Sequence, residues 1–141
     1  MNVKAIAEEL AGKLAGKLAG ITGLRAFGYP VAKLPMPGAI VGLPDEITFD
    51  QTYGRGSDAM TFPVWVMVAR GDERAAAHEL MPYLDGAGAR SVKAALDSTD
   101  TNTYTECDEV TVTMAVPGTY TYNGVDAFGA EFTVNVFGSG S

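Results

Sequence analysis

Two residues in this chain belong to types that commonly carry nucleophilic chemistry, Cys107 and His78, and each is the only residue of its type. A cysteine nucleophile needs a base within hydrogen-bond reach, usually a histidine. The two residues lie far apart in the sequence, and His78 falls in a helix expected to begin at Asp72. The pattern therefore favours a surface or half-buried helix residue over a catalytic base.

Residues 53–58 read Tyr-Gly-Arg-Gly-Ser-Asp and resemble a phosphate-binding loop only in their glycines. A P-loop ends in Gly-Lys-Ser/Thr and opens a helix. This segment lacks that ending, and the apolar runs on either side of it predict that it joins two strands. We interpret it as the tip of a hairpin, where function tends to concentrate on a protein surface.

Other patterns that bind metals or transfer protons are also incomplete. A zinc site needs several cysteine or histidine ligands, and the polar segment 97–106 lacks the glycine and the ligand spacing of an EF-hand. Asp45 and Glu46 are adjacent in an expected strand, so their carboxylates should point to opposite faces. The sequence thus predicts a protein that is not an enzyme, with no catalytic, cofactor-binding or metal-binding residue.

The composition narrows the range of partners. The chain has 141 residues, enough for one domain, and a net charge of −7. Its ten basic residues are scattered, which argues against a basic groove for nucleic acid. One cysteine permits no internal disulfide, residues 1–20 do not read as a signal peptide, and no apolar run reaches the length of about 18 that a membrane helix needs. We expect a single domain over residues 1–137 and a flexible Gly/Ser tail over residues 138–141.

The segment that organises the chain is an expected strand over residues 60–70, which is apolar on both faces. Phe62, Val64 and Val66 fall on one face, and Trp65 and Met67 fall on the other. A strand of this kind is covered on both sides, by helices, another sheet or another subunit. Two interpretations stay open: a buried core strand, or a strand whose Trp65 and Met67 face is covered by a second copy. Pro63 should lie near the strand start or on an edge, since it cannot donate a ladder hydrogen bond.

The remaining elements predict an α+β domain, with an N-terminal helix and a central helical pair packed on a mostly antiparallel or mixed sheet. The first helix carries a leucine stripe, with Lys13 off the stripe and Gly12, Gly16 and Gly20 expected to allow close packing on the sheet. Helices are expected from 72 to 84 and from 91 to 96. Strands are expected over 24–29, 39–43, 46–53, 108–117 and 126–137, with a turn region over 118–124. In the strand over 108–117, Val110, Val112, Met114 and Val116 are expected to face inward.

Several segments together resemble the tail terminator proteins of long-tailed, siphovirus-type phages that infect actinobacteria. They read Ile-Val-Gly-Leu-Pro at 40–44, Ile-Thr-Phe-Asp at 47–50, Tyr-Gly-Arg-Gly-Ser-Asp at 53–58, Phe-Pro-Val-Trp-Val at 62–66, Tyr-Leu-Asp-Gly at 83–86, Ser-Val-Lys-Ala-Ala-Leu at 91–96 and Ala-Glu-Phe-Thr-Val at 130–134. The likeness covers nearly the whole chain, and none of these segments is catalytic.

The resemblance implies an α+β domain that assembles into a homohexameric ring in the neck of the virion, after synthesis in the host cytoplasm. Such a ring caps the finished tail tube, so its partners are further copies of itself, the major tail tube protein, and the head–tail connector or head-closure protein. Genomic DNA passes through without specific binding. Two alternatives stay open: another neck or minor tail component such as a head-closure protein, or a small-ligand binding domain with a pocket lined by Trp65, Tyr29 and Phe132.

Five residues are candidates for contacts between subunits or with the tube. They are Tyr53, Arg55 and Asp58 in the hairpin tip, and Trp65 and Met67 on the central strand. Strand pairing across subunits is a further route, and the last strand, beside the Gly/Ser tail, is the candidate edge.

Overall fold

The computed structural model describes residues 2–49, 57–69, 73–122 and 124–139. Its elements follow the order α1, β1 to β4, α2, α3, β5 and β6. The helices are α1 (Val3–Thr22), α2 (Glu73–Leu84) and α3 (Val92–Leu96). The strands are β1 (Arg25–Phe27), β2 (Gly38–Val41), β3 (Glu46–Thr48), β4 (Ser57–Ala69), β5 (Glu109–Tyr122) and β6 (Val125–Ser139). In the described part of the chain, no helix is long and apolar enough to cross a membrane.

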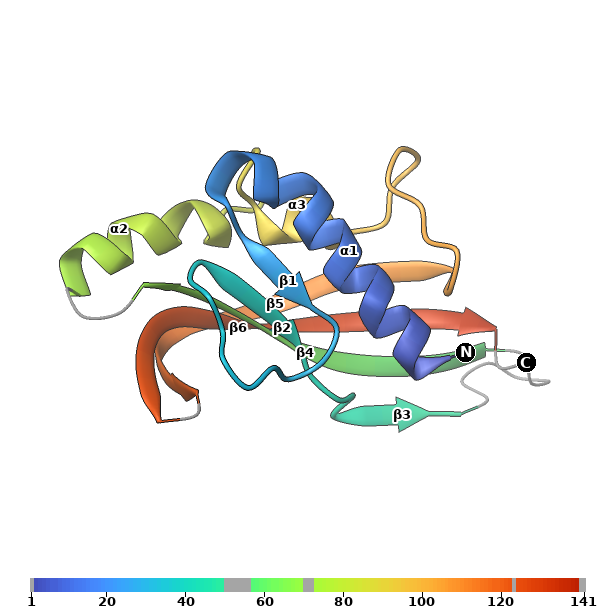
Figure 1. The fold of residues 1–141 in the computed structure, drawn as a ribbon. Helices are drawn as coiled ribbons and strands as arrows, with labels where there is room; N and C mark the ends of the chain where they lie inside the picture. Colours follow the sequence, from blue (N-terminus) through green and yellow to red (C-terminus); the bar gives the residue numbers. More distant parts are fainter. Residues whose placement is uncertain (1, 50–56, 70–72, 123, 140–141) are drawn as a thin grey trace.

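The six strands form one mixed sheet in the order β1-β2-β4-β6-β5, with β3 also paired to β4. Only β1 and β2 are parallel, and all other pairs are antiparallel. The helices pack on one face of this sheet, which we call the inner face, and α1 crosses it diagonally in Figure 1. The α+β class and the helix positions expected from the sequence are confirmed.

The first helix forms where the leucine stripe predicts it. Asn2 caps the helix by accepting a hydrogen bond from the backbone N–H of Ala5 at 3.1 Å. The stripe residues are fully buried between the helix and the sheet: Ile6, Leu10, Leu14 and Leu18. The expectation about the helix glycines is wrong, because Gly12, Gly16 and Gly20 have open space at the Cβ position. Two residues span about 200° of a helix, so glycines two positions from the leucines point away from the sheet.

Pro63 lies in the middle of β4, not near its start, and its position has a structural reason. Its carbonyl accepts a hydrogen bond from Gly42 N–H at 2.9 Å, so its backbone nitrogen faces the same side of β4. On that side β4 pairs with β3 through Ala59 to Thr61 and with β2 through Val64 to Met67. The missing donor therefore falls in the gap between β3 and β2, where no ladder bond is lost.

A β-bulge in β5 overturns the expected inward direction of two side chains. Val110 and Val112 are buried as predicted, but the register shifts between Val112 and Met114. One extra residue reverses the alternation of every later side chain. Met114 and Val116 therefore point to the outer face of the sheet, where they are 55% and 47% exposed.

Strand β5 also runs farther than expected, through Tyr122, so residues 118–122 are strand and not turn. The paired ends of β5 and β6 curl away from the rest of the sheet (Figure 1). The turn between them contains Gly124, whose φ of 81° is one that residues with a Cβ rarely adopt. Gly138 and Ser139, expected in a flexible tail, continue β6 and pair with β4 at Asp58 and Ser57.

Candidate functional site

The five candidate contact residues do not form one surface. Tyr53 and Arg55 lie outside the described residues. Asp58 is the second residue of β4, is buried, and points to the inner face like Met60 and Phe62. Trp65 and Met67 lie at the other end of β4 and point to the outer face, because successive strand side chains alternate.

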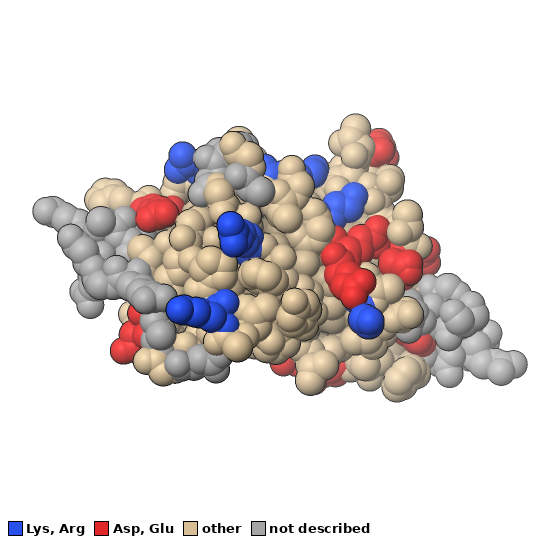
Figure 2. All heavy atoms as spheres, viewed as in Figure 1, with Lys and Arg blue, Asp and Glu red and all other residues tan. Residues whose placement is uncertain are grey.

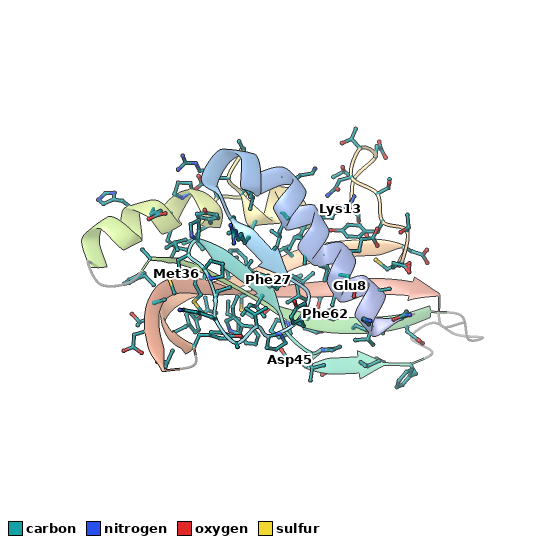
Figure 3. The ribbon with its side chains drawn as sticks, in the orientation of Figure 1. Glu8, Lys13, Phe27, Met36, Asp45 and Phe62 are labelled. Carbon is teal, nitrogen blue, oxygen red and sulfur yellow. The ribbon has the colours of Figure 1, made fainter. Side chains whose placement is uncertain are left out.

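The outer face around Met67 is covered mainly by this chain itself. Met67 is only 3% exposed and packs in a small apolar cluster with Leu34, Ile40 and Ala127. The loop over residues 28–37 crosses the sheet here. Phe27, directly before the loop, and Met36, within it, both pack against this cluster and are labelled in Figure 3. Of the two interpretations left open, burial by the chain itself therefore applies to Met67, because a segment interpreted as a connection folds back over it.

The covering is incomplete and leaves an apolar pocket of about 330 Å³ beside Trp65. Seven residues line it: Pro30, Ile40, Trp65, Met67, Tyr120, Thr121 and Tyr122. The loop and the curled hairpin are fastened together at its rim, because the Tyr122 hydroxyl donates a hydrogen bond to the Val31 carbonyl. Ligand pockets typically have volumes of roughly 300 Å³ or more, so this one lies at the small end of that range.

Two glycines permit the close contacts that shape this pocket. A Cβ on Gly42 would lie 2.6 Å from the Trp65 ring, so the indole lies directly over the Gly42 backbone. A Cβ on Gly38 would lie 2.2 Å from the Pro35 carbonyl oxygen, where the loop crosses β2. Real Cβ atoms do not approach other atoms so closely, and both positions therefore require glycine.

The pocket is not the one expected from Trp65, Tyr29 and Phe132. Phe132 pairs with Val64 and is buried on the inner face, whereas Trp65 pairs with Glu131 on the outer face. Tyr29 is exposed and packs edge-on against Phe27, with ring centroids 6.2 Å apart. The residues that sequence reasoning missed, Tyr120 and Tyr122, lay in the segment interpreted as a turn. Their alternation with threonine was the available signal of a strand.

A second, polar pocket of about 480 Å³ lies near the single cysteine. Eight residues line it: Ser98, Thr99, Asp100, Thr103, Tyr104, Cys107, Asp108 and Glu109. Burial, followed by the nearby carboxylates of Glu9, Asp108 and Glu106, raises the pKa of the Cys107 thiol to about 12. The reactive form of cysteine is the thiolate, so a thiol in this state is a poor nucleophile at neutral pH.

The other groups around this pocket serve to hold the segment before β5 against the helices. Glu9 of α1 accepts hydrogen bonds from the backbone N–H groups of Thr105 and Glu106 at 2.9 and 3.0 Å. Lys13 donates to the Thr103 carbonyl at 2.6 Å and lies over the Tyr104 ring (Figure 3). His78, expected at a surface or half-buried position, is exposed on α2. Within the described residues, no group of three or more His, Cys, Asp or Glu side chains is arranged to hold a metal ion.

The edges of the sheet offer few open backbone groups. The hypothesis that the last strand is an edge is wrong, because β6 lies between β4 and β5. The edge strand β5 is capped along its first half: Val112 N–H donates to the Asp97 carboxylate at 2.7 Å, and Ser98 N–H donates to the Val110 carbonyl at 2.9 Å.

Along the second half of β5, strand alternation places the backbone nitrogen of Pro117 on the outer edge, where proline provides no donor. The opposite edge consists of β1 and, beside β4, the separate β3, and each has three residues. Short or blunted edges of this kind discourage strand pairing between molecules. The outer-face pocket is therefore the better candidate for an interaction than any sheet edge.

Comparison with models of known protein families finds no match, and comparison with curated proteins finds none either.

Proposed function

We propose that this chain is a structural virion protein that forms a ring, caps the phage tail tube and joins it to the head connector. The observation that carries the proposal is an apolar pocket on the outer face of the sheet, accompanied by exposed apolar side chains. Apolar surface of this kind is typical of protein–protein contact sites.

Two further observations support a ring through which DNA passes. The net charge is −7, so the assembled protein would repel the phosphate backbone instead of binding it. In Figure 2 the largest acidic group on the visible face lies beside the first half of α1, where the segment before β5 meets the helix. The resemblance to tail terminator proteins supplies the ring size of six and the partners, the tail tube protein and the head connector.

The first test is the mass of the purified chain in solution. One chain has a mass of 14.7 kDa, so a hexamer has about 88 kDa, six times that value. We expect light scattering coupled to size-exclusion chromatography to find this mass at high protein concentration, and negative-stain electron microscopy to show rings with a central hole. DNA added at low salt should not co-elute with the ring.

The second test measures tail capping directly. Purified protein is added to tails assembled without it, and the tails are then mixed with DNA-filled heads. We expect joined particles and labelled protein at one tail end only. Label at the head vertex, with no label on isolated tails, would support the alternative of a head-closure protein.

A small-ligand binding domain is a second candidate, and the apolar lining of the pocket favours it. The chain has a single tryptophan, and that residue lines the pocket. A chain that stays monomeric at all concentrations, with Trp65 fluorescence changed by small aromatic compounds such as indole, would support this candidate over the ring.

A further inference from the structure

We propose that the apolar pocket beside Trp65 binds an arginine side chain that a basic partner protein presents. The inference goes beyond the proposed ring function, because it names the chemistry of a partner and does not require the chain to form a ring. Three aromatic residues line the pocket, Trp65, Tyr120 and Tyr122, and all three are half-buried, so each stays partly accessible. The face of an aromatic ring attracts cations, and the planar guanidinium group of arginine stacks on such faces.

Two carboxylates at the rim provide the negative charge that a guanidinium group requires. Glu131 pairs with Trp65 across β6 and β4, and Asp126 accepts a hydrogen bond from the hydroxyl of Thr121, which lines the pocket. Burial, followed by the charge of Glu131, raises the pKa of the Tyr120 hydroxyl, so this carboxylate lies close to the pocket wall. Neither carboxylate forms an ion pair with another described residue. A cation that enters the pocket would therefore meet negative charge that no cation of the described chain balances.

The charge of the whole sheet favours the same kind of partner. From β2 to β6, every charged residue in the described strands is acidic. These residues are Glu46, Asp58, Glu109, Asp126 and Glu131. Complementary charge selects between partners, and the chain itself carries a net charge of −7. At this surface, a basic partner protein is therefore favoured over a further copy of the chain.

Two basic residues on neighbouring elements, Arg25 and Lys33, leave the pocket free. Both are exposed, and neither forms an ion pair with another described residue. Arg25 is further separated from the pocket by the loop. It pairs with Gly38, which pairs with Met67 on its other side, and a Cβ on Gly38 would lie 2.2 Å from the Pro35 carbonyl oxygen. The backbone of the loop thus lies between Arg25 and Met67, and the cation must come from another molecule.

Exposed apolar side chains beside the pocket favour a protein over a free small molecule. Val116 pairs with Glu131 and is exposed, and Met114 is exposed on the same face of the sheet. The apolar surface therefore continues past the rim, whereas the pocket itself lies at the small end of the range for ligand sites. A partner that places an arginine in the pocket and an apolar neighbour against Val116 would cover both surfaces. Arginine is also enriched at protein–protein interfaces.

The first experiment compares two short peptides, acetyl-Leu-Arg-Leu-amide and the same peptide with citrulline in place of arginine. Citrulline has nearly the shape of arginine and no charge. Trp65 is the only tryptophan of the chain and lines the pocket, so its emission reports occupancy. We expect the arginine peptide to bind about 10-fold more tightly, with a smaller advantage in high salt. Equal binding of the two peptides, or no binding of either, would overturn the inference.

The second experiment removes one carboxylate at a time and repeats the titrations. Glu131→Gln keeps the size of the side chain, and circular dichroism checks the fold. The matched control is Glu109→Gln, because Glu109 pairs with Phe137, six residues beyond Glu131 on β6 and so about 20 Å from it. We expect Glu131→Gln to weaken binding of the arginine peptide about 5-fold and to leave the citrulline peptide unchanged. An equal effect of the two variants, or no effect of Glu131→Gln, would contradict the assigned site.

Two further measurements separate a partner protein from other sources of the cation, and we expect neither to give the alternative result. Ethylguanidinium that binds as tightly as the arginine peptide would indicate a free small molecule and would overturn the protein partner. A lower mass in solution for Glu131→Gln than for wild type would indicate an arginine of a second copy, and would overturn the assignment of a different partner. Because the peptide titrations need no ring, their failure leaves the proposed function standing, and the tail-capping assay decides that function separately.

Discussion

The two faces of β4 have very different surroundings. On the inner face Phe62, Val64 and Val66 are fully buried against helices whose stripe residues are large and apolar. On the outer face Trp65 and Met67 meet a loop and a curled hairpin, and these lie close only because glycines replace side chains beneath them. The inner face forms the large buried core, and the outer face leaves an apolar pocket open.

The largest expected effect comes from the inner face. Leu14→Ala removes a fully buried side chain and should destabilise the fold by about 2–5 kcal/mol, the usual range for truncating a core leucine. Lys4→Ala is the matched control on the same helix, because the Lys4 side chain is 86% exposed, and it should change stability by less than about 0.5 kcal/mol. Chemical denaturation measures both, and similar losses would contradict the assignment of an inner core.

Lys13 is a poor choice for that control, although its position off the leucine stripe suggested a surface residue. Its ammonium group donates a hydrogen bond to Thr103 and lies over the Tyr104 ring, 5.0 Å from the centroid. Lys13→Ala should therefore cost more than Lys4→Ala, by roughly 0.5–1 kcal/mol for the lost cation–π contact at a partly exposed site.

The next effect tests the close approach on the outer face. Gly129 and Gly118 pair with each other across β6 and β5, but their surroundings differ. A Cβ on Gly129 would lie 2.3 Å from the Val66 carbonyl oxygen, whereas a Cβ on Gly118 would have open space. Gly129→Ala should cost about 1–3 kcal/mol through overpacking. Gly118→Ala should be neutral or slightly stabilising in thermal unfolding. A large loss of stability in Gly118→Ala would show that the backbone conformation of glycine, not crowding at the Cβ position, determines the effect of both substitutions.

A smaller effect is expected where β5 is capped by the segment that follows α3. Asp97→Ala removes the acceptor for Val112 N–H and an ion pair to Lys93 at 2.7 Å. We expect a loss of about 1–2 kcal/mol in urea denaturation, since a hydrogen bond to a charged acceptor is replaced by an unpaired edge group. The variant should also aggregate faster than wild type when stored at high concentration. An unchanged aggregation rate would show that Pro117 alone is sufficient to protect this edge.

The smallest effect depends on pH and involves Glu9. Burial is the largest single influence and raises the pKa of this carboxyl. Hydrogen bonds from Thr105 and Glu106, together with the charge of Lys13, lower the pKa by more than burial raises it, so the pKa lies below its usual 4.5. A lowered folded-state pKa gives stability that is complete above pH 4.5 and is lost as the pH falls through the folded value.

Glu9→Gln should therefore be less stable than wild type at pH 7, by under about 1 kcal/mol, because solvent screens the charge of this half-buried surface carboxylate. The difference should shrink at a pH well below 4.5, as the wild-type carboxyl becomes protonated. Denaturation curves at the two pH values measure it. A difference that stays constant with pH would mean that side-chain shape, not charge, accounts for it.

The secondary structure followed closely from local patterns in the sequence. The leucine stripe and Asn2 define α1, a short helix forms at Val92–Leu96 close to the expected range, and the apolar run over residues 60–69 belongs to the central strand. These features depend on residues that are close together in the sequence, so their physical causes are present in the sequence itself. The same holds for the α+β class, which follows from the order of helices and strands.

The pocket and the direction of Met114 and Val116 were decided only by the tertiary structure. One extra residue at a bulge moves the side chains in the second half of β5 to the opposite faces of the sheet. Whether a bulge forms depends on the partner strand, not on local preference. The loop over residues 28–37 covers Met67 because β1 and β2 hold its ends close together and because Gly38 admits its backbone. By itself the sequence determined which strand is apolar on both faces. Contacts between segments far apart in the chain determined how much of the second face stays open, because burial depends on what folds over a residue and not on the residue alone.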